Sequence, residues 1–381
     1  MSGGNNNQGT AELGKVGDPF RPPVTMDDTE IQLAVIWRKL LSLESVDKEQ
    51  NFFDLGGDSS LAVRMFAEIE DIFKVKLPLA TLYESPTIED LARIVLEGAS
   101  TSGWSPLVPI QPKGSRPPLF CFHGAGGNVL IYRDLSRRLG LDQPFHGLQA
   151  QGLDGSLPPL TTIEDMAALF VKEIKRVQPH GPYFLGGYCG GGTIAYEAAQ
   201  QLRADNEEVA MLALFDTMNW SKIPITLWSK STYAFQRLLF HAASFASLGF
   251  GDQSQFLQEK IATLRNRIPV WRGILEAKLK RNSEDASMAM VLGRIWKIND
   301  LACWQYEPKP YPGSVIDFRP SKQYRIFDKP DLKWDRLAQG GQEVVVLPVY
   351  PASMLLEPFV KHLAAALMKC MDQAITKGET K

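Results

Sequence analysis

The chain has 381 residues, and its 41 basic and 43 acidic side chains give a net charge of −2. Hydrophobic residues make up 44% and charged residues 22%, which is an ordinary globular composition and not that of a disordered or collagen-like chain. The balanced charge argues against a strongly basic nucleic-acid-binding protein. Four cysteines are too few for a disulfide scaffold of this length. The length predicts two or three domains.

The chain also lacks the usual signals for secretion and membrane insertion. Its first residues, MSGGNNNQGT, contain neither the basic nor the apolar region of a signal peptide. No apolar run approaches the roughly 20 residues that a membrane-spanning helix needs. We therefore expect a cytoplasmic protein with reduced thiols, no membrane contact and no bound metal.

The first quarter of the chain predicts a small helical bundle. Residues 1–27 are rich in Gly, Asn and Pro, which predicts a disordered leader. Residues 28–98 are acidic and carry apolar side chains at helical spacing in three segments. Thr87, with Asp90 three residues later, is typical of a capped helix start. The apolar positions are Ile31, Val35, Ile36, Leu40 and Leu41, then Leu61, Met65, Phe66, Ile69 and Phe73, then Ile88, Leu91, Ile94 and Val95.

The rest of the chain has an α/β pattern. Residues 99–115 contain Ser, Gly and Pro and predict an interdomain linker. Residues 116–375 alternate short apolar strands with helices, which predicts a parallel, doubly wound sheet. Between about 220 and 305 the alternation gives way to helical spacing, which predicts a helical insertion. We expect strands at Leu119–Phe122, Phe145–Gln149, Tyr183–Gly186, Val209–Asp216, Val315–Phe318 and Val344–Leu347, and helices at Leu130–Leu139, Ile163–Val177, Gly191–Leu202 and Met354–Met371.

Charge is distributed unevenly between these two parts. Residues 28–98 contain 14 acidic and 7 basic residues, whereas residues 222–297 of the insertion contain 5 acidic and 12 basic residues. Opposite charge favours association, so the bundle is expected to meet the insertion. The alternative is that both surfaces are simply solvated.

A first candidate site lies at Ser59. It follows Gly56 and Gly57 in the sequence DLGGDSSLA, where a loop enters the second predicted helix. An isolated GGDS would be read as a helix cap. Within a small acidic bundle, however, FFDLGGDSSL resembles the carrier domains of nonribosomal peptide synthetases. The resemblance implies that Ser59 is esterified by 4′-phosphopantetheine, and the start of a helix favours a phosphate group.

A second candidate site lies at Cys189. The sequence Gly187-Tyr-Cys-Gly-Gly191 falls between a predicted strand and a predicted helix, which is the setting of a nucleophile elbow with Cys in place of Ser. The alternative is a Gly-rich turn with an incidental cysteine. The backbone N–H groups of Ala125 and Gly190 are expected to form an oxyanion hole. Asp216 ends a later strand, in the chain order expected for the acid of a triad. Because a helix start lowers a thiol pKa, Cys189 is expected to be an accessible, acidic thiol and strand residue Cys121 an inert one.

Several lines of sequence in residues 116–370 resemble the type I thioesterases of peptide and polyketide synthetases. They are FCFHGAGG, GYCGGG, ALFD, WQYEPKPYPG and SMLLEPFV. The resemblance implies an α/β-hydrolase fold in which the insertion is the lid. It also implies that Cys189 accepts an acyl chain from the carrier and that Asp216 orients a histidine.

That histidine is missing from its expected place. The family pattern is Gly-x-His-x-x-Met-Leu, and the position of the histidine is occupied here by Pro351, in VYPASML. His123 is interpreted as structural. A cysteine depends less on a base than a serine does, but hydrolysis needs one to deprotonate water. The pattern therefore favours acyl transfer over hydrolysis. The histidines are His123, His146, His180, His241 and His362.

The sequence as a whole predicts a small all-α bundle followed by an α/β-hydrolase fold with a helical lid. The leading hypothesis is a carrier–thioesterase didomain that moves an acyl group from Ser59 to Cys189 and releases or transfers it. Its expected partners are a phosphopantetheinyl transferase, an upstream acyl-loading enzyme and an acyl or peptidyl substrate. The alternatives are a carrier joined to a catalytically impaired docking module and, less favoured, a free-standing hydrolase.

Overall fold

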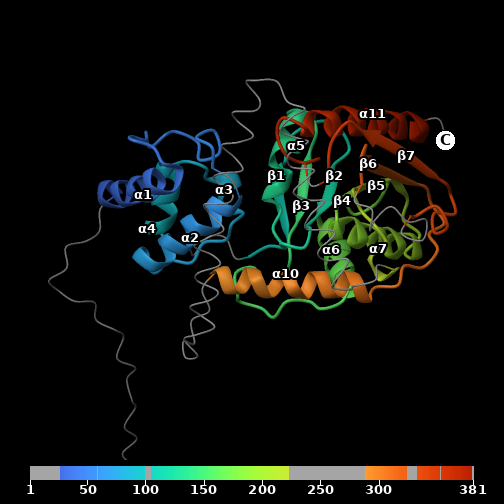
Figure 1. Cartoon of the computed structure of the whole chain (residues 1–381), viewed down its shortest axis with the longest axis horizontal. Helices are drawn as coiled ribbons and strands as arrows, with labels where there is room; N and C mark the ends of the chain where they lie inside the picture. Colours follow the sequence, from blue (N-terminus) through green and yellow to red (C-terminus); the bar gives the residue numbers. More distant parts are fainter. Residues whose placement is uncertain are drawn as a thin grey trace, which may run out of the picture.

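The computed structural model describes residues 26–57, 59–98, 104–222, 288–323, 333–351 and 353–379. It contains a helical domain and an α/β domain that lie side by side (Figure 1). Nearly all of the expected leader and most of the expected lid, with His241, lie outside the described residues.

The helical domain contains four helices in the described residues: α1 (Met26–Leu41), α2 (Ser59–Phe73), α3 (Thr81–Glu84) and α4 (Ile88–Leu96). Three of them were predicted, but the four-residue α3 is too short to show a helical period. The hydroxyl of Thr87 accepts a hydrogen bond from the Asp90 N–H at 3.1 Å, which confirms the predicted cap. Trp37 and Phe52 form the centre of the core, with ring centroids 5.1 Å apart.

The α/β domain is built on a seven-stranded sheet with the order β1-β3-β2-β4-β5-β6-β7. All neighbouring strands are parallel except β1 and β3. The strands are β1 (Leu107–Gln111), β2 (Leu119–Phe122), β3 (Phe145–Leu148), β4 (Tyr183–Tyr188), β5 (Val209–Phe215), β6 (Val315–Pro320) and β7 (Gln342–Leu347). The helices are α5 (Arg133–Leu139), α6 (Ile163–Val177), α7 (Gly190–Ala204), α10 (Met288–Gln305) and α11 (Val360–Glu379), with short 3₁₀ turns at Leu130–Tyr132 and Trp220–Lys222.

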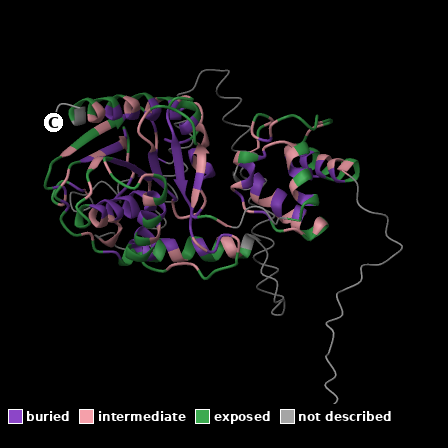
Figure 2. Cartoon of the chain, turned by 180° about the vertical axis from the view of Figure 1, so that it is seen from behind, coloured by how far each residue is buried: buried purple, intermediate pink, exposed green. Residues whose placement is uncertain are grey.

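Helices cover both faces of the sheet, as predicted for a doubly wound fold. Helices α6 and α7 pack on one face around Phe122 and Leu185, together with residues of α10. Helices α5 and α11 pack on the other face around Cys121 and Phe215. Figure 2 shows how strongly the buried residues concentrate in the central strands. No helix in the described ranges is long and apolar enough to span a membrane.

Several boundaries differ from the sequence-based expectation, and two of the differences have a physical cause. Strand β1 lies inside the segment expected to be a linker, because its short irregular sequence, LVPIQ, pairs with the edge of β3. The final helix was expected from Met354 but begins at Val360. Pro358 lacks an N–H donor, and the chain before it forms turns instead of a helix.

Candidate active site and carrier interface

Cys189 occupies a sharp turn between β4 and α7. Its φ is +55°, a strained conformation for a residue with a side chain. A Cβ atom added at Gly187 would lie 2.2 Å from the carbonyl oxygen of Gly191, and one at Gly191 would lie 2.2 Å from the carbonyl oxygen of Phe122. Both glycines are therefore required by close backbone approach. This geometry supports the predicted nucleophile elbow.

The loop after β2 lies against the first turn of α7. The position that a Cβ of Gly190 would take is 3.9 Å from the Ala125 nitrogen, so the two candidate oxyanion donors are neighbours. The Asn299 side chain, on α10, donates a hydrogen bond to the Ala125 carbonyl at 3.0 Å and holds this loop in place. The sulfur of Cys303, also on α10, lies 2.9 Å from the same position at Gly190. Sequence reasoning missed both α10 residues because helical periodicity does not reveal which loop a helix contacts.

The Cys189 thiol is not acidic. Burial and, less strongly, the nearby carboxylate of Asp216 raise its pKa to about 12, although a backbone hydrogen bond from Gly190 acts in the opposite direction. The prediction of a lowered pKa is therefore wrong, because the effect of the helix start is outweighed by burial and by a like charge. Cys121 is fully buried, and burial raises its pKa, as expected for an inert thiol.

Asp216 lies where the sequence predicts the acid, directly after β5. Its φ is +45°, and its N–H donates to the Phe318 carbonyl at 2.9 Å, which fixes the residue against β6. Its Oδ1 atom accepts a hydrogen bond of 2.6 Å from the side-chain nitrogen of Gln323. Sequence reasoning missed Gln323, since a glutamine shortly after a strand matches no catalytic motif.

The described histidines are engaged elsewhere. His123 is fully buried, its Nδ1 lies 2.8 Å from the Gly124 carbonyl oxygen, and burial lowers its pKa to about 4, which supports the structural interpretation. His146 is stacked on Phe120 within the sheet. His180 pairs with Glu207 before β4, at the opposite end of that strand from Cys189. His362 lies on α11, and Pro351 is buried in the turn after β7.

Replacing Asp216 with asparagine is expected to make Cys189 more reactive. The substitution removes a negative charge that disfavours the thiolate, so the Cys189 pKa falls and the thiolate fraction at pH 8 rises severalfold. Iodoacetamide alkylation followed by peptide mass spectrometry measures this rate. Asp300→Asn is the matched control and should have a smaller effect, because Asp300 raises the Cys189 pKa less than Asp216 does. Slower alkylation of Asp216→Asn, as in an enzyme with an intact triad, would contradict the expectation.

Ser59 is the first residue of α2, as predicted. The preceding turn is tight: Gly56 has a φ of +90°, and a Cβ at Gly57 would lie 2.3 Å from the Phe52 ring. The Gly57 N–H donates to the Phe52 carbonyl at 2.9 Å. The turn is thus anchored to the domain core, and it brings Ser59 to the start of a 15-residue helix.

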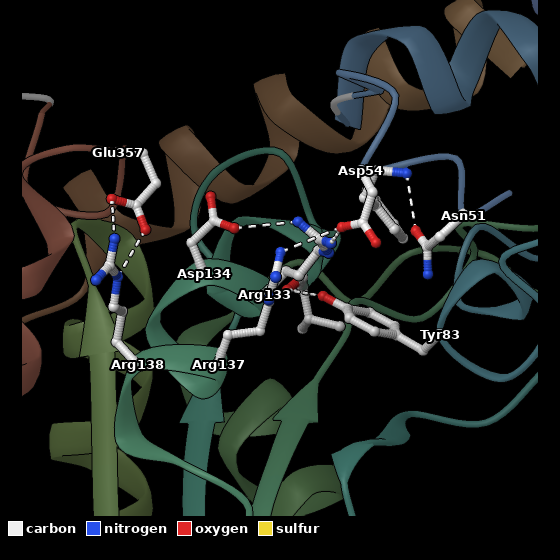
Figure 3. Close-up of polar contacts among 10 residues, drawn as sticks. Asn51, Asp54, Tyr83, Arg133, Asp134, Arg137, Arg138 and Glu357 are labelled. Carbon is white, nitrogen blue, oxygen red and sulfur yellow. Dashed lines mark hydrogen bonds and ion pairs between the residues drawn. The ribbon is translucent and has the colours of Figure 1, made fainter. Parts of the chain in front are cut away.

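The loop before Ser59 docks on α5 of the α/β domain (Figure 3). Asp54 forms ion pairs with Arg133 at 3.1 Å and Arg137 at 3.4 Å. The Arg133 guanidinium lies 4.3 Å from the centroid of the Phe53 ring, and burial lowers the pKa of this arginine. The ion pairs of the acidic domain are therefore made with α5, whereas the sequence predicted the insertion as its partner; the described part of the insertion contacts this domain through the apolar side chain of Leu292.

Apolar and hydrogen-bond contacts extend this docking towards the oxyanion loop. The Tyr83 hydroxyl, on α3, donates to the Val129 carbonyl at 2.9 Å. Leu130, next in the chain, is buried in the core of the helical domain, and Leu292 of α10 packs against the same core. A cleft of about 290 Å³ remains between the domains, lined in part by Asn51 and Gln111. The interface thus combines polar and apolar contacts and leaves a cleft open between the domains.

Replacing Arg133 with glutamine is expected to loosen this docking. It removes an ion pair and a cation–π contact, together worth about 1–2 kcal/mol, so the undocked fraction should rise about 5–30-fold. Backbone ¹⁵N relaxation of the helical domain in the full chain measures the faster tumbling of the undocked state. Arg138→Gln is the matched control, because Arg138 pairs with Glu357 within the α/β domain (Figure 3). Equal effects of the two substitutions would contradict the assigned interface.

Comparison with known proteins identifies both domains. Residues 32–95 match the family model of the phosphopantetheine attachment site, and residues 117–224 match that of the thioesterase domain. The chain is therefore a phosphopantetheine carrier domain followed by a thioesterase domain with an α/β-hydrolase fold. Across both domains the chain is similar to nonribosomal peptide synthetases.

The chain spans only a small part of the synthetases to which it is similar. The dimodular nonribosomal peptide synthase of Bacillus subtilis (strain 168) is 33% identical over 317 residues, which are 82% of this chain and 13% of that protein. Malpibaldin synthetase of Mortierella alpina is 41% identical over 192 residues, 50% of this chain and 4% of that protein. A solved holo four-domain nonribosomal peptide synthetase, bound to AMP and glycine, matches with a TM-score of 0.56 and 26% identity over 94% of this chain and 27% of that one.

Proposed function

We propose that this didomain acts in nonribosomal peptide or polyketide biosynthesis in the cytoplasm. In this proposal an acyl group carried at Ser59 is moved to Cys189 and then released or transferred to an acceptor. A phosphopantetheinyl transferase and an upstream acyl-loading enzyme are the expected partners. The observation that carries the proposal is the docking of the carrier beside the oxyanion loop, through Tyr83 and Val129. The relationship to a dimodular nonribosomal peptide synthase across both domains supports it.

The residues around Ser59 fit a phosphopantetheine group. The anchored glycine turn places Ser59 at the positive end of the α2 dipole, which favours a phosphate ester there. When bound, the group supplies a thiol on a flexible arm that carries the acyl chain as a thioester. Ser59 would hold the group, and the contacts of Asp54 with α5 would hold the carrier against the thioesterase domain.

The residues of the thioesterase domain would have different roles in acyl transfer. Cys189 presents its thiol on the elbow, and the N–H groups of Ala125 and Gly190 stabilise negative charge on the acyl oxygen. Because burial and the charge of Asp216 raise the Cys189 pKa, only a small fraction of this thiol is ionised at pH 7. The thiolate is a strong nucleophile, so acyl uptake is possible but slow in this arrangement. Asp216 does not promote ionisation of the thiol.

A second candidate function is a carrier protein with an impaired hydrolase-fold docking domain. The raised pKa of Cys189 and the hydrogen bond between Asp216 and Gln323 favour it, since neither belongs to an active triad. In this alternative the α5 interface would store the loaded carrier without turning it over. The two candidates differ in whether Cys189 ever becomes acylated.

An intact-mass experiment tests the proposal. The full chain is incubated with a phosphopantetheinyl transferase and an acyl-CoA, and the acylated residues are mapped by peptide mass spectrometry over time. We expect acyl groups first at Ser59 and then at Cys189, and at Ser59 alone in Cys189→Ala. A chain that remains acylated at Ser59 for hours without a trace of acyl-Cys189 would overturn the proposal and support the docking function.

A further inference from the structure

A side-chain partner of the acid Asp216 comes from an unexpected loop. Gln323 lies three residues after the end of β6, and its side-chain nitrogen donates to Asp216 Oδ1 at 2.6 Å. The position where the family pattern places histidine, Pro351, lies in the loop after β7. That turn is closed by hydrogen bonds between Tyr350 and Ser353. The loop after β6 therefore provides a side chain that contacts the acid.

Three adjacent strands bring the relevant residues to one edge of the sheet. Cys189 follows β4, Asp216 follows β5 and Gln323 follows β6, and these strands are parallel neighbours. The Cys189 N–H donates to the Phe215 carbonyl at 3.0 Å, so the elbow is attached to the residue just before Asp216. The negative charge of Asp216 also acts on the thiol of Cys189.

The amide of Gln323 has two polar ends with different surroundings. Its nitrogen donates a hydrogen bond to Asp216, whereas its Oε1 atom is buried and has no hydrogen-bond partner among the described residues. A triad histidine has the same two-ended arrangement, with an N–H group on the acid and an acceptor nitrogen opposite. An amide oxygen, however, is far too weakly basic to accept a proton at neutral pH.

We propose that Gln323 takes the place on Asp216 that a triad histidine would take, and that it acts as a positioning residue that holds the acid in a site without a general base. This inference rests on the proposed function of Cys189 as the nucleophile. The two features are separate: Pro351 occupies the position where the family pattern has the base, and Gln323 contacts the acid. A histidine at position 323 would then be in reach of Asp216, whose charge acts on the thiol.

Alkylation of Cys189 across a range of pH tests the inference and requires neither a carrier arm nor acyl transfer. For the unsubstituted chain we expect the iodoacetamide rate to rise with pH and to show no inflection between pH 5 and 8. Gln323→His should introduce an inflection near the ordinary imidazole pKa of about 6.5 and raise the rate at pH 8 at least tenfold. Pro351→His, the comparison variant, should introduce none.

Two results would overturn the inference. One is a folded Gln323→His chain, as judged by thermal melting, whose alkylation profile has no inflection. The other is an inflection in Pro351→His alone. Gln323→Glu keeps the shape of the side chain and provides a second measurement if the histidine variant does not fold. Its added negative charge should slow alkylation at pH 8 at least threefold, and an unchanged rate would also contradict the inference. Absence of acyl-Cys189 in the mass experiment would instead count against the proposed function.

Discussion

Changing Ser59 to alanine will abolish attachment of the phosphopantetheine arm. Attachment forms a phosphate ester on a hydroxyl, and in the proposed function Ser59 supplies it at the start of α2, after a turn that is anchored on Phe52. Alanine is a good helix former, so α2 itself should remain. After incubation with a phosphopantetheinyl transferase and CoA, intact-mass spectrometry should show the added arm on the unsubstituted chain and none on Ser59→Ala.

Ser60→Ala is the matched control for this experiment. Ser60 is the next residue of α2, so the two variants remove the same chemical group one position apart. The control should gain the full mass of the arm. A mass gain that persists in Ser59→Ala, or that is lost in Ser60→Ala instead, would assign the attachment to another residue.

The parts of the site that are local in sequence could be predicted well. The elbow at Cys189 is recognisable because close backbone approach demands glycine at two fixed positions, Gly187 and Gly191, whatever the rest of the fold does. The start of α2 at Ser59 follows from a glycine turn for the same reason. Helix α6 could be placed to the residue, since Thr162 caps it with a hydrogen bond from the Asp165 N–H and its apolar period is regular.

The parts that depend on long-range contacts could not be predicted. Arg133 and Asp54 are 79 residues apart, and neither belongs to a motif. Gln323 reaches Asp216 across a separation of 107 residues, and a glutamine has no chemistry that would make it a candidate by type. The pKa of Cys189 was predicted to be lowered but is raised, and this error has the same origin. Burial and the charge of Asp216 act through space and leave no pattern in the sequence around the elbow.

The absence of a base at the expected position should affect hydrolysis of the loaded acyl group most strongly. We expect the loaded, unsubstituted chain to lose its acyl group to water at least about 10²-fold more slowly than to a millimolar thiol or amine acceptor. Base catalysis typically contributes about 10²–10⁴-fold to such a reaction, and the position of the expected base is Pro351. Asp216 accepts a hydrogen bond from the weakly basic amide of Gln323, and His123 is buried and held neutral by its lowered pKa. Thiols and amines are better nucleophiles than water and depend less on such a base.

Time-resolved intact-mass spectrometry of the acyl-loaded chain, with and without an added acceptor, measures both rates in one sample. Cys189→Ala, loaded in the same way, gives the rate at which the acyl group is lost from the carrier arm without catalysis. The added acceptor should accelerate this loss only as much as it accelerates the reaction of a free thioester in solution. Hydrolysis of the unsubstituted chain at many turnovers per second would contradict the expectation, because it requires a base at the site. His123 and His362 would then be the first residues to substitute, and the preference for transfer over hydrolysis would lose its physical reason.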